Sequence, residues 1–181
     1  MVKGLSKIMT KVLIMSDTHG QTALMHDVIK RHRAEVDKII HAGDGQFASS
    51  DDITNVIAVC GNMAEEIKLP DEKTLEIDDT RLLLCHGHLD ENIAYSPMRL
   101  QFKGLENQTN VLVFGHTHQP FASYFDDLLL LNPGSLAKSR DIRLKATGTY
   151  AILTITTQNY LVDFYNQEGD LLPSLLINYK R

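Results

Sequence analysis

The stretch KVLIMSDTHG, residues 11–20, decides the fold that we expect for this chain. It opens with an apolar, β-rich run that is typical of a buried parallel strand. Asp17 and His19 follow directly, so a core strand ends in side chains that ligate metal ions. Because a buried strand holds its end rigidly, we expect both side chains to reach one ion.

Four further apolar segments end in polar clusters of the same kind. The clusters are Gly43-Asp44, Gly61-Asn62, His86-Gly87-His88 and Gly115-His116-Thr117-His118. In an α/β sheet, the loops that follow the carboxyl ends of strands gather along one edge, which is where ligands bind. We therefore expect all five clusters to form a single site.

The chemistry of these clusters points to two metal ions. Imidazole, carboxylate and amide donors suit Zn²⁺, Mn²⁺, Fe or Ni²⁺ better than the all-oxygen cages of Ca²⁺ and Mg²⁺. Each motif alone is more often structural, since Gly-Asp is usually a turn, but the five in order are specific. A pair of ions roughly 3.5–4 Å apart activates water and holds a phosphoryl group. The candidate ligands are Asp17, His19, Asp44, Asn62, His86, His116 and His118.

The rest of the chain alternates strands and helices. Ser96 is expected to cap a helix with Pro97 at its first position, followed by Met98, Phe102 and Leu105 at i, i+4 and i+7. A further helix is expected over residues 22–33, and an antiparallel pair over 74–77 and 81–85. Other strands are expected at 38–42, 55–60, 111–114, 121–125, 128–131, 150–156 and 160–165.

Length and charge limit the class of protein. A chain of 181 residues with 43% hydrophobic residues favours one domain, residues 1–181. A net charge of −5 without a long basic block argues against a nucleic-acid-binding surface, so nucleic acid is expected only as a substrate. Residues 1–10 lack a leader's apolar segment, and no 18 apolar residues run together, so we expect a cytoplasmic protein without a membrane span. Cys60 and Cys85 are expected to be structural thiols.

The five clusters resemble the signature of the calcineurin-like metallophosphoesterase superfamily. Within it, the short chain, the HGH and GHTH forms and the Asn132-Pro-Gly-Ser135 turn resemble the small bacterial and archaeal phosphodiesterases, a branch related to a retromer subunit of eukaryotes. The resemblance covers a core of about residues 11–165. It implies a four-layer α/β/β/α fold, in which helices flank two packed mixed sheets, with a dinuclear metal centre at one edge.

The resemblance also implies a role for each ligand. It places Asp17, His19 and His118 on one ion, places Asn62, His86 and His116 on the other, and makes Asp44 the bridge. A hydroxide between the ions would attack phosphorus, and the Asn62 amide would orient the substrate. The expected cofactors are two divalent ions, with manganese favoured over Ni, Zn, Fe or Mg. The expected enzyme is a phosphoric diester hydrolase with a small phosphodiester as its substrate.

One position departs from the family pattern. Most members carry a His after the Asn, as the supposed proton donor to the leaving group, whereas this chain has Met63, which cannot donate a proton. His88 is the nearest spare imidazole and is a candidate catalytic residue beside Asp44 and Asn62. Glu65 and Glu66 are also candidates, although solvated loop charges are the commoner role for such residues.

Two other functions stay open. The alternative is a protein-binding module of the same fold that keeps its metals but is weakly active or inactive. A metal-dependent hydrolase of another bond is disfavoured, because His-Glu-x-x-His and Cys-x-x-Cys motifs are absent. The apolar C-terminal stretch, residues 171–179, is expected to pack on the core, and a homo-oligomer stays open.

Overall fold

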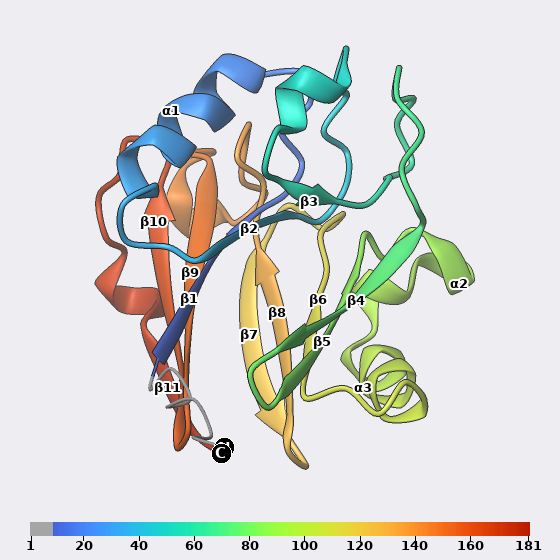
Figure 1. Ribbon diagram of the computed structural model, residues 1–181, viewed down its shortest axis with the longest axis vertical. Helices are drawn as coiled ribbons and strands as arrows, with labels where there is room; N and C mark the ends of the chain where they lie inside the picture. The colour runs from blue at the N-terminus through green and yellow to red at the C-terminus, as the bar shows by residue number, and fades with distance from the viewer. Residues whose placement is uncertain (1–8) are drawn as a thin grey trace, which may run out of the picture.

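The computed structural model describes residues 9–181, which form two β-sheets packed face to face (Figure 1). One sheet has six strands in the order β11-β10-β9-β1-β2-β3, and the other has five in the order β4-β5-β6-β8-β7. A core of aliphatic side chains, including Val12, Ile14, Leu84 and Val113, fills the space between the sheets.

The six-stranded sheet is built around β1 (Met9–Met15), the strand predicted from the opening stretch. β1 runs parallel to β2 (Lys38–His41), which in turn runs parallel to β3 (Ile57–Ala58). On its other side, β1 pairs antiparallel with the first of three antiparallel strands. These are β9 (Thr149–Thr156), β10 (Asn159–Asn166) and β11 (Ile177–Lys180).

The five-stranded sheet places three strands parallel at its centre and one antiparallel strand at each edge. The parallel strands are β5 (Thr80–Cys85), β6 (Val111–Val113) and β8 (Leu128–Pro133). The edge strands are β4 (Glu72–Ile77), which pairs with β5 as predicted, and β7 (Pro120–Phe125), which pairs with β8.

Helices cover the outer face of each sheet. α1 (Thr22–His32) packs Met25 and Val28 on the six-stranded sheet, beside Leu13 and Met15. α2 (Leu89–Asn92) and α3 (Pro97–Glu106) lie outside the five-stranded sheet, where Leu100 of α3 is fully buried. Short 3₁₀ helices complete the chain: η1 (Ser50–Ile53), η2 (Ile93–Tyr95), η3 (Ile142–Leu144) and η4 (Pro173–Leu175). The expected four-layer α/β/β/α fold is confirmed.

Two expectations on elements need correction. The strand expected over residues 55–60 shrinks to β3, Ile57–Ala58, because the chain continues as a loop from Val59. The clusters come from the edges of two sheets, not one, and within each sheet the strands involved run parallel. The sequence pattern of α3 did not assign a buried face, and the structure leaves its spaced apolar residues in solvent, since Met98, Phe102 and Leu105 are each about half exposed or more.

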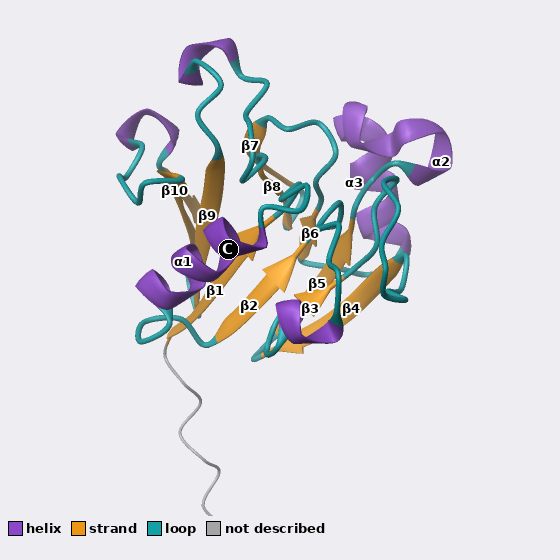
Figure 2. Cartoon of the chain, turned by 90° about the horizontal axis from the view of Figure 1, so that it is seen from above, coloured by secondary structure: helices purple, strands orange, loops and turns teal. Residues whose placement is uncertain are grey.

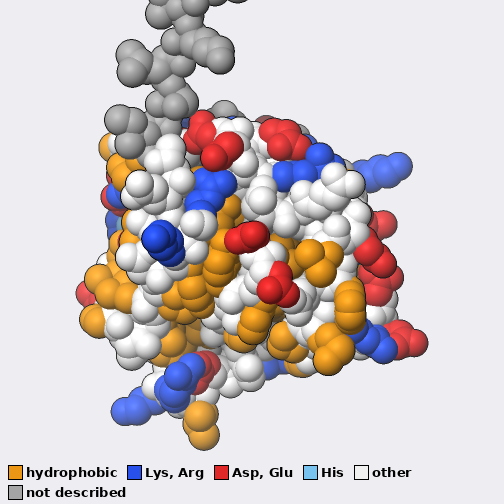
Figure 3. Space-filling model, turned by 90° about the horizontal axis from the view of Figure 1, so that it is seen from below, with side chains coloured by type: hydrophobic (Ala, Val, Ile, Leu, Met, Phe, Trp, Pro, Cys, Tyr) orange, Lys and Arg blue, Asp and Glu red, His pale blue; other side chains and the backbone are white. Residues whose placement is uncertain are grey.

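The C-terminal stretch packs on the core as expected. Leu172, Leu175, Ile177 and Tyr179 contact the cluster between the sheets, and β11 adds an edge strand. The view from below in Figure 3 shows the end of the sheets opposite to the ligand loops, where apolar side chains alternate with charged ones. No helix within residues 9–181 is long and apolar enough to cross a bilayer. The leader expectation concerns residues 1–10, of which 1–8 lie outside the described residues.

Candidate metal centre

The five polar clusters meet at one end of the molecule, where the loops after β1, β2, β3, β5 and β6 come together (Figure 2). The first three loops belong to the six-stranded sheet and the last two to the five-stranded sheet. The site therefore lies at the seam between the sheets. Its carboxylates and amide come from one sheet, and its imidazoles, apart from His19, come from the other.

Asp17, His19 and His118 form one group of converging donor atoms. Asp17 Oδ1 lies 3.0 Å from His118 Nε2 and 3.9 Å from His19 Nε2. The two imidazole nitrogens are 3.2 Å apart. One ligand atom from each of these residues thus faces the other two, and the three atoms all lie within 4.8 Å of one another, close enough to hold one metal ion.

A second group contains Asp17, Asp44 and His86, all of them buried. His86 Nε2 lies 3.4 Å from Asp44 Oδ2 and 3.2 Å from Asn62 Oδ1. Asp17 belongs to both groups. In this geometry Asp17 lies between the two sets of imidazoles, and the exposed Asn62 amide lies beside His86 in the second set.

His116 lies beside the second group without joining it. Its ring centroid is 5.1 Å from that of His86, and its Nε2 is 3.2 Å from Asn92 Oδ1. All seven predicted ligands are thus brought to one place, with six in direct donor contact and His116 next to them. Their roles as ligands stay predictions.

The charges of the site support the carboxylates as anions. Burial works to raise the pKa of Asp17, but the hydrogen bond from His118 and the charges of His86 and His118 lower it overall. Burial opposes ionisation of Asp44 too, yet contact with His86 and the backbone N–H of Met63 hold its pKa at about 2. Burial lowers the pKa of His116, helped by the neighbouring His86. Burial works to lower the pKa of His86, but its contact with Asp44 and the charge of Asp17 raise it overall. The site thus offers anionic carboxylates, the form that binds metal, beside its imidazoles.

The backbone of the site is strained. Five predicted ligands hold a left-handed conformation with φ between 50° and 68°, which non-glycine residues rarely adopt: Asp17, His19, Asp44, His116 and His118. Such residues cluster where a function requires them. Two glycines let the chain approach the carboxylates closely. A Cβ at Gly61 would lie 1.9 Å from Asp44 Oδ1, and one at Gly115 would lie 2.9 Å from Asp17 Oδ2.

The sequence did not reveal the residues that brace these loops. Ser16 Oγ donates to Asp17 Oδ2 at 2.6 Å. Asn132 Nδ2 donates to the carbonyl of Gly115 at 2.7 Å, and Ser135 Oγ donates to the Asp17 carbonyl at 2.9 Å. The Asn-Pro-Gly-Ser turn thus ties the first ligand loop to the last. Its only signal in the sequence was its place in the family resemblance.

Glu65 is likewise a bracing residue. Its carboxylate accepts the backbone N–H groups of Gly45, Gln46 and Phe47 at 3.0, 3.0 and 2.7 Å. The expectation of a solvated loop charge is wrong for this residue, because its carboxylate binds the backbone of the loop that follows Asp44. Glu66, next to it, is exposed.

His88 and Met63 differ in what they offer the site. The His88 ring lies 5.4 Å from that of His86, and its buried Nδ1 has no hydrogen-bond partner. Burial and the charge of His86 lower the pKa of His88, which favours the neutral ring. Its role as a proton donor stays a prediction. Met63 contributes its backbone N–H to Asp44 Oδ1 at 2.8 Å, while its side chain is 42% exposed.

The donor set fits a metal pair on two observations. The buried Asp17 Oδ1 faces two imidazole nitrogens, His118 Nε2 at 3.0 Å and His19 Nε2 at 3.9 Å. One carboxylate oxygen and two imidazole nitrogens that converge within 4.8 Å are donors that suit a divalent transition-metal ion. His86 Nδ1 donates to the Ala42 carbonyl at 2.7 Å, which leaves Nε2 free to coordinate.

Comparisons with known proteins agree with this geometry. The chain is 34% identical over 165 residues to a probable metallophosphoesterase of Bacillus subtilis, YsnB, covering 91% of this chain and 95% of that protein. A predicted phosphoesterase from Streptococcus pneumoniae shares the structure with a TM-score of 0.88 at 27% identity, covering 97% and 99% of the two chains. The Zn²⁺ complex of Vps29 from Entamoeba histolytica has a TM-score of 0.73 at 17% identity, over 94% and 99%. That last likeness concerns the fold alone.

The family model for the calcineurin-like phosphoesterase superfamily domain matches residues 10–158, which include every predicted ligand. The match agrees with the resemblance drawn from the five clusters and with the two-sheet fold. This chain belongs to the calcineurin-like phosphoesterase superfamily.

Proposed function

We propose that the protein is a metal-dependent phosphodiesterase that works at a dinuclear centre. The observation that carries the proposal is the convergence of seven nitrogen- and oxygen-bearing side chains at the seam of the two sheets, around the buried carboxylates of Asp17 and Asp44. Asp17, His19 and His118 would hold one ion, and Asn62, His86 and His116 the other. Asp44 would bridge them, since a carboxylate readily spans two cations.

Two bound divalent ions would supply an activated water and positive charge for the phosphoryl oxygens. The residues of the chain do the rest. The Ala42 carbonyl fixes the His86 ring so that Nε2 faces the centre. The backbone N–H of Met63 holds one oxygen of Asp44 and leaves the other to the site. The Asn62 amide, exposed at the rim, would orient a phosphoryl group.

Several finer expectations belong to the same proposal. Manganese is the favoured ion, with Ni, Zn, Fe and Mg as the alternatives, since donor sets of this type accept several metals and availability decides among them. The proposed substrate is a small phosphodiester. Nucleic acid would interact with the protein only as a substrate and not as a binding partner. The whole chain, residues 1–181, is proposed to be one domain that acts in the cytoplasm.

The alternative is a protein-binding module of the same fold. Its support is the likeness to Vps29, which is one of fold alone. Loss of ligands would favour it, but the seven ligand positions are all occupied by donor side chains that meet in space. A catalytic centre therefore explains the site better than a surface that only docks a partner.

Hydrolysis of bis-p-nitrophenyl phosphate tests the proposal. Metal-stripped protein would receive Mn²⁺, Ni²⁺, Zn²⁺ or Mg²⁺ separately, with Asp44→Asn as the site variant and exposed Asp27→Asn as the matched control. We expect metal to restore turnover in the wild type and in Asp27→Asn but not in Asp44→Asn. Tight binding of two ions without turnover would favour the binding module, and a failure to bind metal would refute both.

A further inference from the structure

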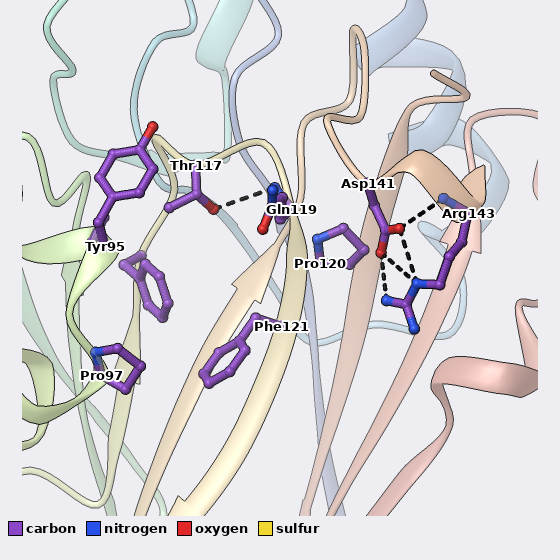
Figure 4. Close-up of a pocket in the computed structure, with 10 residues that line it drawn as sticks. Tyr95, Pro97, Thr117, Gln119, Pro120, Phe121, Asp141 and Arg143 are labelled. Carbon is purple, nitrogen blue, oxygen red and sulfur yellow. Dashed lines mark hydrogen bonds and ion pairs between the residues drawn. The ribbon is translucent and has the colours of Figure 1, made fainter. Parts of the chain in front are cut away.

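A cavity of about 310 Å³ opens beside the candidate metal centre (Figure 4). It lies between the segment that leads into α3 and the connection from β6 to β7, with the 141–143 loop at its far side. Its lining includes Tyr95, Pro97, Phe114, Thr117, Gln119 and Phe121.

The cavity and the centre share a wall. The Tyr95 ring meets the ring of His116 edge to face, with their centroids 5.5 Å apart. Thr117, which follows His116, lines the cavity directly. A phosphate ester held at the centre would therefore place one of its substituents within reach of this cavity. The lining of the cavity then indicates which kind of substituent it can bind.

The lining suits a flat ring. Phe114 and Phe121 pack edge to face at 6.2 Å, and Figure 4 shows Phe121 and Pro97 along the apolar floor with the Tyr95 ring above them. Tyr95 is 58% exposed, so its ring is available for stacking. Aromatic rings of this kind stack on any flat π-system. Gln119 at the rim offers an amide to the edge of such a ring.

Charge argues against a second anionic group in the cavity. Among the described residues that line it, Arg143 carries the only positive charge, and Asp141 accepts hydrogen bonds from its Nε and Nη2. The pair leaves little net charge to attract a further phosphate. The volume lies at the lower end of the range for ligand pockets, about 300–1,000 Å³, which suits one ring system.

We propose that this cavity binds an uncharged flat ring, a nucleobase or an aryl group, carried as one ester substituent of the phosphoryl substrate. Tyr95 and Phe121 are then specificity-determining residues. The inference rests on the proposed function, because the centre must hold the phosphate that carries the ring.

Binding of phosphate monoesters tests this inference without turnover. Thymidine 5′-monophosphate, phenyl phosphate and methyl phosphate would be titrated calorimetrically into the manganese-loaded protein. We expect the two ring-bearing esters to bind about 10-fold tighter than methyl phosphate, as one stacked ring contributes. A preference for the thymidine ester identifies a nucleobase, and equal affinities of the two identify an aryl ring in general.

Variants locate the preference. Tyr95→Ala should remove most of the margin between ring-bearing esters and methyl phosphate, and Phe121→Leu, which keeps apolar volume, should reduce it. Phe102→Ala is the matched control, since Phe102 is 59% exposed on α3 and does not line the cavity. Equal affinities for all three esters in the wild type, or an unchanged margin in Tyr95→Ala, would overturn the inference.

Hydrolysis of bis-p-nitrophenyl phosphate by the same wild-type sample separates the two claims. Turnover together with equal affinities for the three esters would refute the proposed ring-binding cavity but would still support the phosphodiesterase function. If none of the three esters binds and no turnover occurs, the proposed function fails and the ring cavity fails with it.

Discussion

At the scale of single residues, the site stores strain that its neighbours must offset. A left-handed backbone costs a non-glycine residue about 1–2 kcal/mol, and five predicted ligands adopt it. Backbone hydrogen bonds between the loops oppose this cost. The Asp17 N–H donates to the Gly43 carbonyl at 3.0 Å, and the Arg140 N–H donates to the His118 carbonyl at 2.8 Å. The ligand loops therefore hold one another in place.

Glu65 should contribute measurably to this mutual support. Its carboxylate accepts hydrogen bonds from three backbone N–H groups. A hydrogen bond to a charged group contributes about 1.5–3 kcal/mol to the stability of the folded state. We expect Glu65→Ala to lower the free energy of unfolding of the metal-free protein by at least about 1.5 kcal/mol in urea titrations. Glu66→Ala, at an exposed neighbour, should change it by less than about 0.5 kcal/mol. Equal losses in the two variants would contradict the bracing role.

Met63 should determine which esters are hydrolysed. Its thioether cannot protonate a leaving group, and burial lowers the pKa of His88, which favours the neutral ring. We expect aryl diesters, whose leaving groups need no proton, to be hydrolysed far faster than alkyl diesters at the same pH. Met63→His should narrow the difference, and kcat/KM for p-nitrophenyl and methyl diesters is the measurement. Equal rates for the two esters in the wild type would show that another group donates the proton.

His41 should make stability depend on pH. Burial lowers its pKa to about 4 from 6.5, against the opposing charges of Asp17 and Asp44 and with the help of His86 and His19. Above pH 6.5 the ring is neutral in both states. Between pH 6.5 and 4 the unfolded chain binds a proton that the folded chain does not, so stability falls by up to about 1.4 kcal/mol per pH unit.

Urea unfolding of the metal-free protein at pH 7 and pH 5 measures this effect. His41→Gln lacks the titrating ring, so we expect it to lose less stability than the wild type over the same interval. Only the difference between the two pH values is compared, which removes any constant cost of the substitution. The same loss in both proteins would show that His41 is not the group responsible.

At the scale of elements, α3 shows how a helix can present its apolar residues to solvent. The i, i+4, i+7 pattern predicted its existence, and the Ser96 cap and Pro97 predicted its first turn, where Ser96 Oγ accepts the Arg99 N–H at 3.4 Å. The inward face is set instead by Leu100 and by Gly104, whose missing side chain admits Leu128 of β8.

This face assignment predicts unequal costs for two substitutions in α3. Leu100 is fully buried, so Leu100→Ala should lower the free energy of unfolding by about 2–5 kcal/mol. Phe102→Ala truncates a larger but solvent-exposed side chain, so it should change the free energy of unfolding by only about 0.5 kcal/mol. Urea denaturation of the two variants provides the comparison. A larger loss for Phe102→Ala would mean that its face is covered in solution.

The elements that the sequence predicted well are those with strong local signals. The apolar run before Asp17, the antiparallel pair over 74–77 and 81–85 and the Ser96-Pro97 cap each act through their own neighbours in the chain. The sequence also indicated which residues converge, because strand ends gather at an edge. It could not indicate the three N–H groups that Glu65 accepts or the bracing by Ser135, since these depend on contacts between residues far apart in the chain. β3 is shorter than the strand expected from the sequence, because an apolar composition does not specify where hydrogen bonding to the neighbouring strand stops.

At the scale of the whole molecule, the site joins the two sheets. Asp17, His19, Asp44 and Asn62 follow strands of one sheet, whereas His86, His116 and His118 follow strands of the other. An ion held by residues from both sheets would bridge the main core of the molecule. Its binding free energy would then act on the stability of the entire fold.

Metal should therefore raise the melting temperature of the whole protein. A ligand at 100 times its Kd stabilises the folded state by about 2.7 kcal/mol, which for a chain of this size is roughly 5–10 °C. We expect Mn²⁺ to shift the thermal transition of the chelator-treated wild type and of Asp27→Asn by this amount, and to shift Asp44→Asn far less. Circular dichroism and differential scanning calorimetry should report one transition, because both sheets share the ligands. Identical melting temperatures with and without metal in the wild type would mean that these donors hold no ion.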